Sequence, residues 1–211
     1  MASGLPGPAR NSGDVTGENA DVEAAREFYA GLGLEWGLRV PAWIEWSRGR
    51  SVLHQRLMWL RRGERHVHAA APGVAVDLAA AADLEAVCAI DAAAFGGEAS
   101  ADAPWLAALL AAPDDVVAVA FARVDGRAAA TGYAVLASGE AGRTAMLGGI
   151  AVLEEQRRRG VGAALSAWLV RRGFEAGAHL AHLSPDDDRA ARLYARLGFT
   201  ETAGHDVHVD L

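Results

Sequence analysis

The residues whose types and spacing suggest chemistry most directly are 157–163, where three arginines precede Gly160-Val161-Gly162-Ala163. They lie between an apolar run at 145–152 and an amphipathic segment. Glycines let backbone amides approach a ligand closely, and the amino end of a helix carries a partial positive charge. A strand, an arginine-glycine turn and a helix in this order predict a binding site for a diphosphate.

A run of arginines is also typical of a solvated charged surface, but Gly160 and Gly162 favour the diphosphate site. These glycines do not form a dinucleotide-binding fingerprint. Leu165 stands where the third glycine of that motif belongs, and polar residues 154–159 separate the turn from the strand. A P-loop is excluded because the chain contains no Gly-Lys-Ser/Thr sequence.

A second motif occupies residues 184–199. Its predicted helix carries Ala190, Leu193 and Tyr194, and Gly198-Phe199 follows. The aspartates at 186–188 most simply cap this helix. Local context alone favours an amphipathic core tyrosine over a functional residue at position 194.

The elements that must position these motifs alternate in type from residue 74 onward. The hydrophobic periodicity predicts a strand at 74–78, helices at 82–95 and 104–111, strands at 116–124, 128–137 and 145–152, a helix ending near 176, a strand at 179–183, a helix at 187–196 and a strand at 205–211. Asp125-Gly126 predicts a hairpin turn. The order indicates a mixed α/β (α+β) fold around one sheet.

The residues before 74 divide into two segments. Residues 1–20 are rich in Gly, Ser, Pro, Asn and Asp and predict a mobile, disordered tail. Residues 21–73 form an amino-terminal extension with a short helix at 21–29 and a strand at 34–40. Residues 25–34 repeat the pattern of 190–199 almost position for position, which indicates either an internal duplication or a chance likeness between two helix ends.

Together, the two motifs resemble those of the GNAT superfamily of acyl-CoA-dependent N-acetyltransferases over residues 74–211. Arg157, Gly160 and Gly162 match the family's diphosphate signature, and the Ala-x-x-Leu-Tyr helix with Gly-Phe matches its carboxyl-terminal pattern. The resemblance implies a mixed central sheet flanked by helices, here with an amino-terminal extension. Two residues depart from the family pattern: Asp187 replaces a frequent Asn, and Glu154 replaces a frequent Pro.

The resemblance also implies acetyl-CoA as co-substrate, with no metal. The cofactor-binding residues would be Ile150, Ala151, Val152, Arg157, Arg158, Arg159, Gly160, Val161, Gly162, Ala163 and Asp187. Backbone groups of residues 150–152 would pair with pantetheine, and one amide would polarise the thioester carbonyl. Gly148-Gly149 in the same strand would permit a β-bulge or a close backbone approach.

By the same resemblance, Tyr194 is the catalytic general acid that protonates the departing thiolate. The base stays unassigned, because no carboxylate lies in 145–152. Candidates are Glu98, Asp102, Glu154 and Glu155, each of which is also typical of an ordinary surface acid.

The implied reaction is acetyl transfer from acetyl-CoA to a primary amine of a small molecule or peptide, in a direct ternary complex. The alternative is a non-catalytic acyl-CoA-binding or sensing module, which would keep 157–163 but not need Tyr194. A protein-interaction domain without any ligand is a further alternative.

Composition narrows the partners of the protein. A net charge of −7 over 211 residues argues against nucleic acid. The chain has neither an 18-residue apolar run nor a signal pattern, which predicts no membrane partner and a cytoplasmic location. Cys88 is the single cysteine, and the alternating histidines at 66 and 68 and at 205 and 208 lack a further partner at metal spacing. A homodimer is compatible with the sequence.

Overall fold

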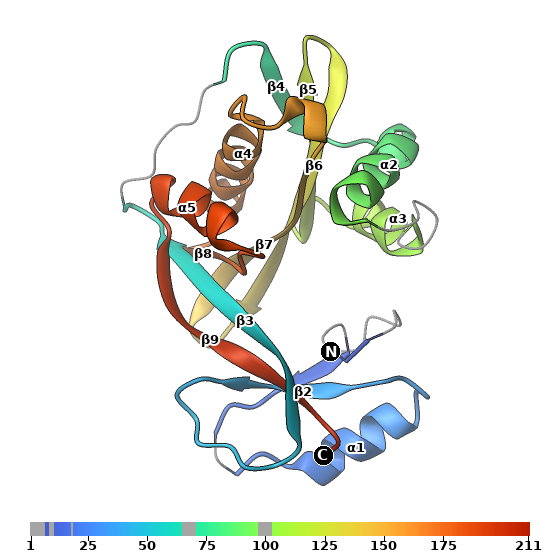
Figure 1. The fold of residues 1–211 in the computed structure, drawn as a ribbon, viewed down its shortest axis with the longest axis vertical. Helices are drawn as coiled ribbons and strands as arrows, with labels where there is room; N and C mark the ends of the chain where they lie inside the picture. The colour runs from blue at the N-terminus through green and yellow to red at the C-terminus, as the bar shows by residue number, and fades with distance from the viewer. Residues whose placement is uncertain (1–6, 9–10, 18, 65–70, 97–102) are drawn as a thin grey trace. The chain divides into compact units, whose positions relative to one another are not determined.

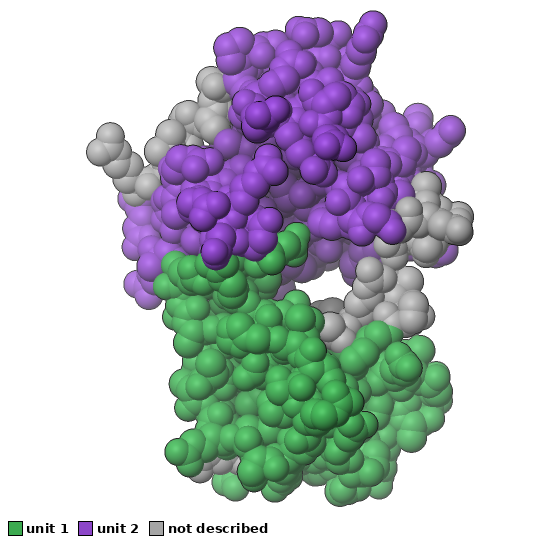
Figure 2. Space-filling view, in the orientation of Figure 1, with its two compact units in different colours: residues 1–57, 184–186, 201–211 green, residues 58–183, 187–200 purple. Residues whose placement is uncertain are grey.

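The computed structural model describes residues 7–8, 11–17, 19–64, 71–96 and 103–211. The chain divides into two compact units, which Figure 2 shows in different colours. Unit 1 comprises residues 1–57, 184–186 and 201–211, and unit 2 comprises 58–183 and 187–200. The first strands and most of the last strand of the chain share unit 1. The segment boundaries expected at residues 20 and 73 stay predictions.

The elements from residue 74 onward follow the predicted order (Figure 1). They are β4 (Val74–Leu78), η1 (Ala81–Asp83), α2 (Leu84–Phe95), α3 (Ala103–Ala111), β5 (Val117–Val124), β6 (Arg127–Gly139), β7 (Gly142–Val152), η2 (Glu154–Gln156), α4 (Val161–Glu175), β8 (Leu180–Leu183), α5 (Asp188–Arg196) and β9 (Thr200–Val209). Element types are therefore confirmed, and most ends lie within a few residues of the prediction. The last strand begins earlier than expected, at Thr200 rather than near 205.

The sheet of unit 2 has the strand order β3-β8-β7-β6-β5-β4, where β3 (Arg50–Arg61) contributes its last four residues. Its pairs are antiparallel except β7 with β8. The hairpin between β5 and β6 turns at Asp125 and Gly126, whose φ values are 50° and 78°. Asp-Gly is favoured where two consecutive residues need positive φ angles. The predicted hairpin is therefore confirmed.

Helices cover both faces of this sheet. The first hydrophobic cluster joins one face to α4 and α5 through residues such as Leu165, Leu169 and Tyr194. The second cluster joins the other face to α2 and α3 through residues such as Val87 and Leu106. Cys88 lies in the second cluster with 6% of its surface exposed. Unit 2 is thus a three-layer arrangement with β7 in the middle of the sheet.

Strand β7 pairs with β8 over only a small part of its length. Only Thr144, Ala145 and Met146 are in register with β8, and β7 has no β8 partner from residue 147 to 152. On the other side, the register between β6 and β7 shifts between Thr131 and Tyr133, where Gly149 has a φ of 58°. The expected bulge at Gly148-Gly149 is therefore confirmed, and residues 147–152 of β7 have no strand partner on the β8 side.

Unit 1 contains β1 (Ser12–Asp14), α1 (Val22–Ala30), β2 (Gly37–Pro41) and the first part of β3, in the strand order β1-β2-β9-β3. Its core includes Val15, Val22, Leu38 and Val40. Sequence alone predicted a mobile tail over residues 1–20, and within it the structure has the short strand β1. The polar backbone of β1 pairs with β2 in parallel, and Val15 enters the core with 2% of its surface exposed.

The pattern that residues 25–34 share with residues 190–199 has a structural counterpart in α1 and α5. Asp21 accepts a hydrogen bond from the amide of Ala24 (2.9 Å), and Asp187 accepts one from Ala190 (2.7 Å). Each helix buries its tyrosine, Tyr29 or Tyr194. Burial raises the pKa of the Tyr29 phenol. A strand follows each helix, and those strands, β2 and β9, pair antiparallel with each other. The likeness extends beyond the sequence pattern to capping and burial.

We expect unit 1 to lose stability in mild acid because of His205. Burial and then the charge of Arg39 lower the pKa of His205, whose Nε2 lies 2.7 Å from Oε1 of Gln55. The unfolded chain then binds more protons than the folded one as pH falls through about 6.5, so stability decreases there. His205→Gln should show a smaller loss of melting temperature between pH 7.5 and 5. Identical pH dependence in both proteins would contradict this role.

Candidate functional site

The segment that links β7 to α4 forms a tight loop with two left-handed residues. After Val152 the chain makes one turn of 3-10 helix, and Gly160, the N-cap of α4, has φ 80° and ψ 0°. Arg158 has a φ of 65°, although arginine rarely adopts this region. Such strain costs on the order of 1–3 kcal/mol and is concentrated at ligand sites. The loop conformation therefore directs attention to this segment.

A cavity of about 260 Å³ lies at the amino end of α4. It is lined by Val152, Gln156, Arg157, Arg158, Gly160, Val161, Gly162, Ala163, Arg189, Leu193 and Arg196. The lining contains four arginines and no acidic residue. The first N–H groups of a helix have no intrahelical acceptor. Amides at the start of α4 and the arginines around them make this cavity suited to a polyanion such as a diphosphate.

Two of the predicted arginines also hold the loop in shape. The Nε of Arg157 donates a hydrogen bond to the carbonyl of Val152 at 3.1 Å. Arg159 donates to Oε1 of Gln156 at 2.7 Å and lies 3.6 Å from a carboxylate oxygen of Asp125. Arg157 thus ties the loop to the strand end. Arg159 is not among the residues that line the cavity, and its role toward the cofactor stays a prediction.

Sequence analysis missed Arg189 and Arg196 of α5. They stand seven positions apart, or about two helical turns, so they share one side of the helix with Leu193. Arg192 is exposed and is absent from the cavity lining. The seven-residue spacing was a usable signal, but only the packing of α5 beside the loop shows that this side faces the cavity.

The predicted pantetheine-binding residues lie on the open part of β7. Val152 borders the cavity, Ala151 is buried in the second cluster, and Ile150 is half-buried against the first. These residues fall within 147–152, which has no β8 partner. An extended ligand arm therefore has an edge along which to form backbone hydrogen bonds, which is consistent with their predicted role.

Tyr194 and Asp187 lie at opposite ends of α5. Tyr194 is 7% exposed, and its ring centroid is 5.9 Å from that of Phe199. Asp187 caps the helix through its bond from Ala190. The sequence allowed Tyr194 to be a core residue and Asp187 to be a helix cap, and the structure has both features. The roles of these two residues toward a cofactor stay predictions.

Two of the four candidate bases lie among the described residues. Glu154 and Glu155 are exposed on η2. Glu98, Asp102 and the histidine pair at 66 and 68 lie outside the described residues. Within the described part of the chain, no His, Cys, Asp or Glu side chains gather in a group of three that would hold a metal ion.

Comparison with protein families identifies the chain. Residues 84–199, more than half of the sequence, match the family model described as the acetyltransferase (GNAT) family. The chain belongs to this family. The open edge of β7 and the cavity at α4 therefore lie in a GNAT domain, and the protein is an acetyltransferase.

Solved structures agree with the family. A GCN5-related N-acetyltransferase from Kribbella flavida is similar at 25% identity and TM-score 0.69, over 90% of this chain and 74% of that one. AAC(6')-Iy bound to a CoA bisubstrate analog is similar at 25% identity and TM-score 0.52, over 61% of this chain and 92% of that one. Glucosamine-6-phosphate N-acetyltransferase from Arabidopsis thaliana, at 13% identity and TM-score 0.52 over 62% and 93%, shares the fold alone. Among curated proteins, none matches the sequence significantly.

The Kribbella structure matches both units of this GNAT protein, since the alignment covers 90% of the chain, whereas the other two cover about three fifths. The helices of the described residues include none that is long and apolar enough to cross a membrane.

Proposed function

We propose that this protein transfers an acetyl group from acetyl-CoA to a primary amine in a direct ternary complex. The observation that carries the proposal is the arginine-lined cavity at the amino end of α4, beside the stretch of β7 that has no partner on its β8 side. The cavity would hold the diphosphate, and the open edge would receive pantetheine. Together they account for both halves of coenzyme A.

In the proposed reaction, the neutral amine nitrogen attacks the thioester carbonyl carbon. The C–N bond forms, the C–S bond breaks, and one proton passes in net from nitrogen to sulfur. A backbone amide at Ile150, Ala151 or Val152 would polarise the carbonyl oxygen, and Tyr194 would donate a proton to sulfur. Cys88, the single cysteine, is buried, which fits the absence of an acylated cysteine intermediate.

Structural relatives support an amine acceptor. AAC(6')-Iy is an aminoglycoside N-acetyltransferase whose structures contain CoA and a CoA–acetylneamine analog. The Arabidopsis relative acts on glucosamine 6-phosphate. For the present protein, the acceptor class extends to small-molecule and peptide amines.

Calorimetry with acetyl-CoA, followed by a thiol-release assay with a panel of primary amines, tests this function. We expect saturable binding, thiol release that depends on an amine, and an intact protein mass after incubation with acetyl-CoA alone. Binding without turnover on any amine would support the sensing module instead. No binding at all would overturn the proposal.

We also predict that the α5 arginines contribute to acetyl-CoA affinity. Arg189→Ala and Arg196→Ala should each weaken acetyl-CoA binding about tenfold, because each removes a cation from the cavity that would hold the diphosphate. The difference from the unaltered protein should shrink as salt is added. Arg192→Ala, on the same helix but outside the cavity lining, is the matched control. An equal loss in all three variants would show that only the net charge of α5 matters.

A further inference from the structure

Tyr133 of β6 lies directly over the bulge of β7. Tyr133 and Gly148 are opposite each other in the register of the two strands. A Cβ built on Gly148 would stand 2.8 Å from the hydroxyl oxygen of Tyr133, and one built on Gly149 would stand 2.7 Å from its Cε1. Real Cβ atoms do not approach other atoms so closely. The two glycines therefore leave the space that the phenol occupies.

The need for glycine at 148 comes from this ring and not from the backbone. Gly149 has a φ of 58°, which by itself favours glycine, whereas Gly148 is not among the residues with positive φ. An ordinary side chain at 148 would displace the Tyr133 ring. The phenol thus takes the place on β7 that the side chain of residue 148 would otherwise fill.

The direction of the proposed cofactor brings its thioester toward Tyr133. The phosphate cavity lies beyond the carboxyl end of β7, at Val152. Pantetheine paired along β7 therefore runs back from Val152 toward Ile150, with its thioester end nearest to Gly149 and Gly148. Two residues of an extended strand span about 7 Å. An amine that attacks an acetyl group held at residue 150 would therefore come within reach of Tyr133, which lies opposite residue 148.

The ring also lies on the face from which an acceptor would approach. Tyr133 packs with the second cluster, under α2 and α3, whereas the diphosphate site is formed by α4 and α5 on the first-cluster side. Both faces carry buried apolar residues next to the sheet. A nucleophile that reaches the thioester from the second-cluster side, opposite α4 and α5, would meet the Tyr133 ring at the bulge of β7.

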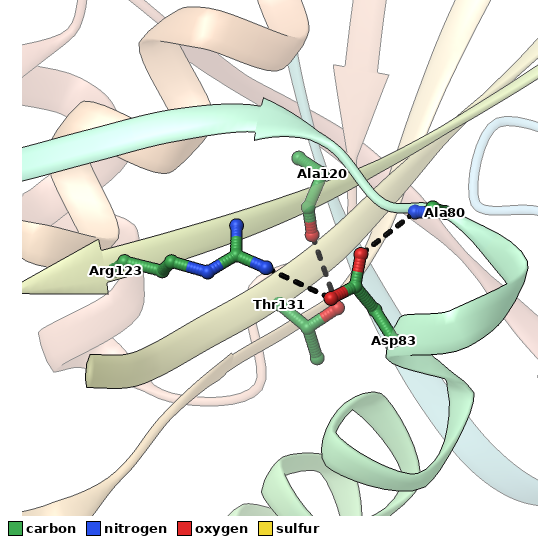
Figure 3. Close-up of polar contacts among 5 residues, drawn as sticks. All are labelled: Ala80, Asp83, Ala120, Arg123 and Thr131. Carbon is green, nitrogen blue, oxygen red and sulfur yellow. Dashed lines mark hydrogen bonds and ion pairs between the residues drawn. The ribbon is translucent and has the colours of Figure 1, made fainter. Parts of the chain in front are cut away.

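Three polar side chains near the second cluster, Asp83, Arg123 and Thr131, form the hydrogen bonds and the ion pair that Figure 3 shows. Arg123 forms an ion pair with Asp83 at 2.8 Å and lies over the ring of Phe121, 4.2 Å from its centroid. The hydroxyl of Thr131 donates to the carbonyl of Ala120 at 3.1 Å. Asp83 also accepts a hydrogen bond from the amide of Ala80. These contacts fix the strands around Tyr133 and give Asp83 a structural role.

We propose that the hydroxyl of Tyr133 belongs to the acceptor site, where it accepts a hydrogen bond from the attacking amine and orients its lone pair toward the thioester. This inference rests on the proposed acetyl transfer. Strand β7 carries no carboxylate in 142–152, and the phenol supplies a hydrogen-bonding group at that place. The chemistry stays balanced, because Tyr133 orients the amine while the proton passes in net from nitrogen to sulfur.

The position of Tyr133 is testable without knowing the acceptor, because the chain has only three tyrosines. Tyrosine labelled with ¹³C at Cζ gives three signals, which Tyr29→Phe, Tyr133→Phe and Tyr194→Phe assign. We expect acetyl-CoA to shift the Tyr133 signal more than free CoA does. The signal of Tyr29, which stacks on Trp36 in unit 1, is the reference.

The outcomes separate the two proposals. If calorimetry detects acetyl-CoA binding but the Tyr133 signal does not move, this inference is overturned and the proposed function stands. If acetyl-CoA does not bind, both fall.

An activity measurement then tests the role of the hydroxyl. With the primary amine that gives the fastest thiol release, Tyr133→Phe should raise the KM for the amine about tenfold, since one hydrogen bond to substrate is lost. The KM for acetyl-CoA should stay unchanged. An unchanged amine KM and kcat would overturn the proposal.

Gly148→Ala gives an independent check through the ring itself. Its methyl group should displace the phenol and raise the amine KM in the otherwise unaltered protein. In a Tyr133→Ala background, where the space is free, the same change should have little effect. Equal effects in both backgrounds would show that Gly148 acts without Tyr133.

Discussion

Gly162→Asp should weaken acetyl-CoA binding at least about 100-fold and leave the fold intact. Gly162 lies in the first turn of α4 and lines the arginine-rich cavity. A carboxylate there would repel the diphosphate and occupy space that the ligand needs. The same carboxylate is favourable at the amino end of a helix, so stability should not fall. Calorimetry gives the affinity, where a factor of 100 is about 2.7 kcal/mol, and thermal unfolding gives the stability.

Gly162→Ala is the matched control. A Cβ at this position would lie 3.4 Å from Val152 Cγ2 and 3.6 Å from Leu193 Cδ1, which are ordinary contacts. We expect this variant to bind acetyl-CoA nearly as well as the unaltered protein. Strong binding by the aspartate variant would show that the diphosphate lies elsewhere. Equal loss in both variants would mean that any side chain at 162, and not its charge, is excluded.

Local sequence signals predicted most of unit 2 because its elements are short-range features. Asp125-Gly126 specifies a turn with two positive φ angles, and the structure has that turn. Gly148-Gly149 marks the bulge for a similar reason, since Gly149 is left-handed. The loop 157–163 was predicted as a binding site because its glycines and arginines are contiguous. Each of these depends on residues that are neighbours in the chain.

Features that depend on distant residues were not predicted. The last residues of β3 pair with β8, so that Met58 lies opposite Leu183 across more than a hundred positions. Strand β1 is stabilised by β2 and by the burial of Val15, although its own composition is typical of a mobile segment. A polar stretch with one apolar residue gains a fixed structure when a sheet edge is present, and the sequence of that stretch does not reveal the edge.

The residues of the candidate site also fall into those that a local motif predicts and those that only packing brings together. Residues 157–163 form a continuous motif, whereas Arg189 and Arg196 reach the cavity only because α5 packs beside α4. Tyr133 is a lone aromatic residue in an apolar strand, and its pattern is the same as that of a core residue. Its proposed role depends on its position over two glycines of a neighbouring strand. Packing thus brings further side chains to a candidate site whose centre is a local motif.

Tyr194→Phe should lower kcat by a factor of about 10²–10⁴ and leave acetyl-CoA affinity within about twofold of its original value. General acid catalysis typically contributes a factor of this size. Phenylalanine keeps the ring against Phe199 in the first cluster, so the helix and the diphosphate cavity should persist. Single-turnover thiol release and calorimetry measure the two quantities separately. A thiolate that must leave without a proton donor raises the barrier only for the chemical step, so binding and turnover should separate.

Tyr29→Phe is the control for this substitution. Tyr29 holds the corresponding position in the echoed segment, is 2% exposed and stacks on Trp36 with ring centroids 5.2 Å apart. Its hydroxyl lies in unit 1, outside the elements that form the diphosphate site, so its removal should affect stability and not kcat. If the two variants lose turnover equally, the effect of Tyr194→Phe comes from packing. If Tyr194→Phe alone loses turnover at unchanged affinity, the buried phenol of α5 donates the proton that the leaving thiolate requires.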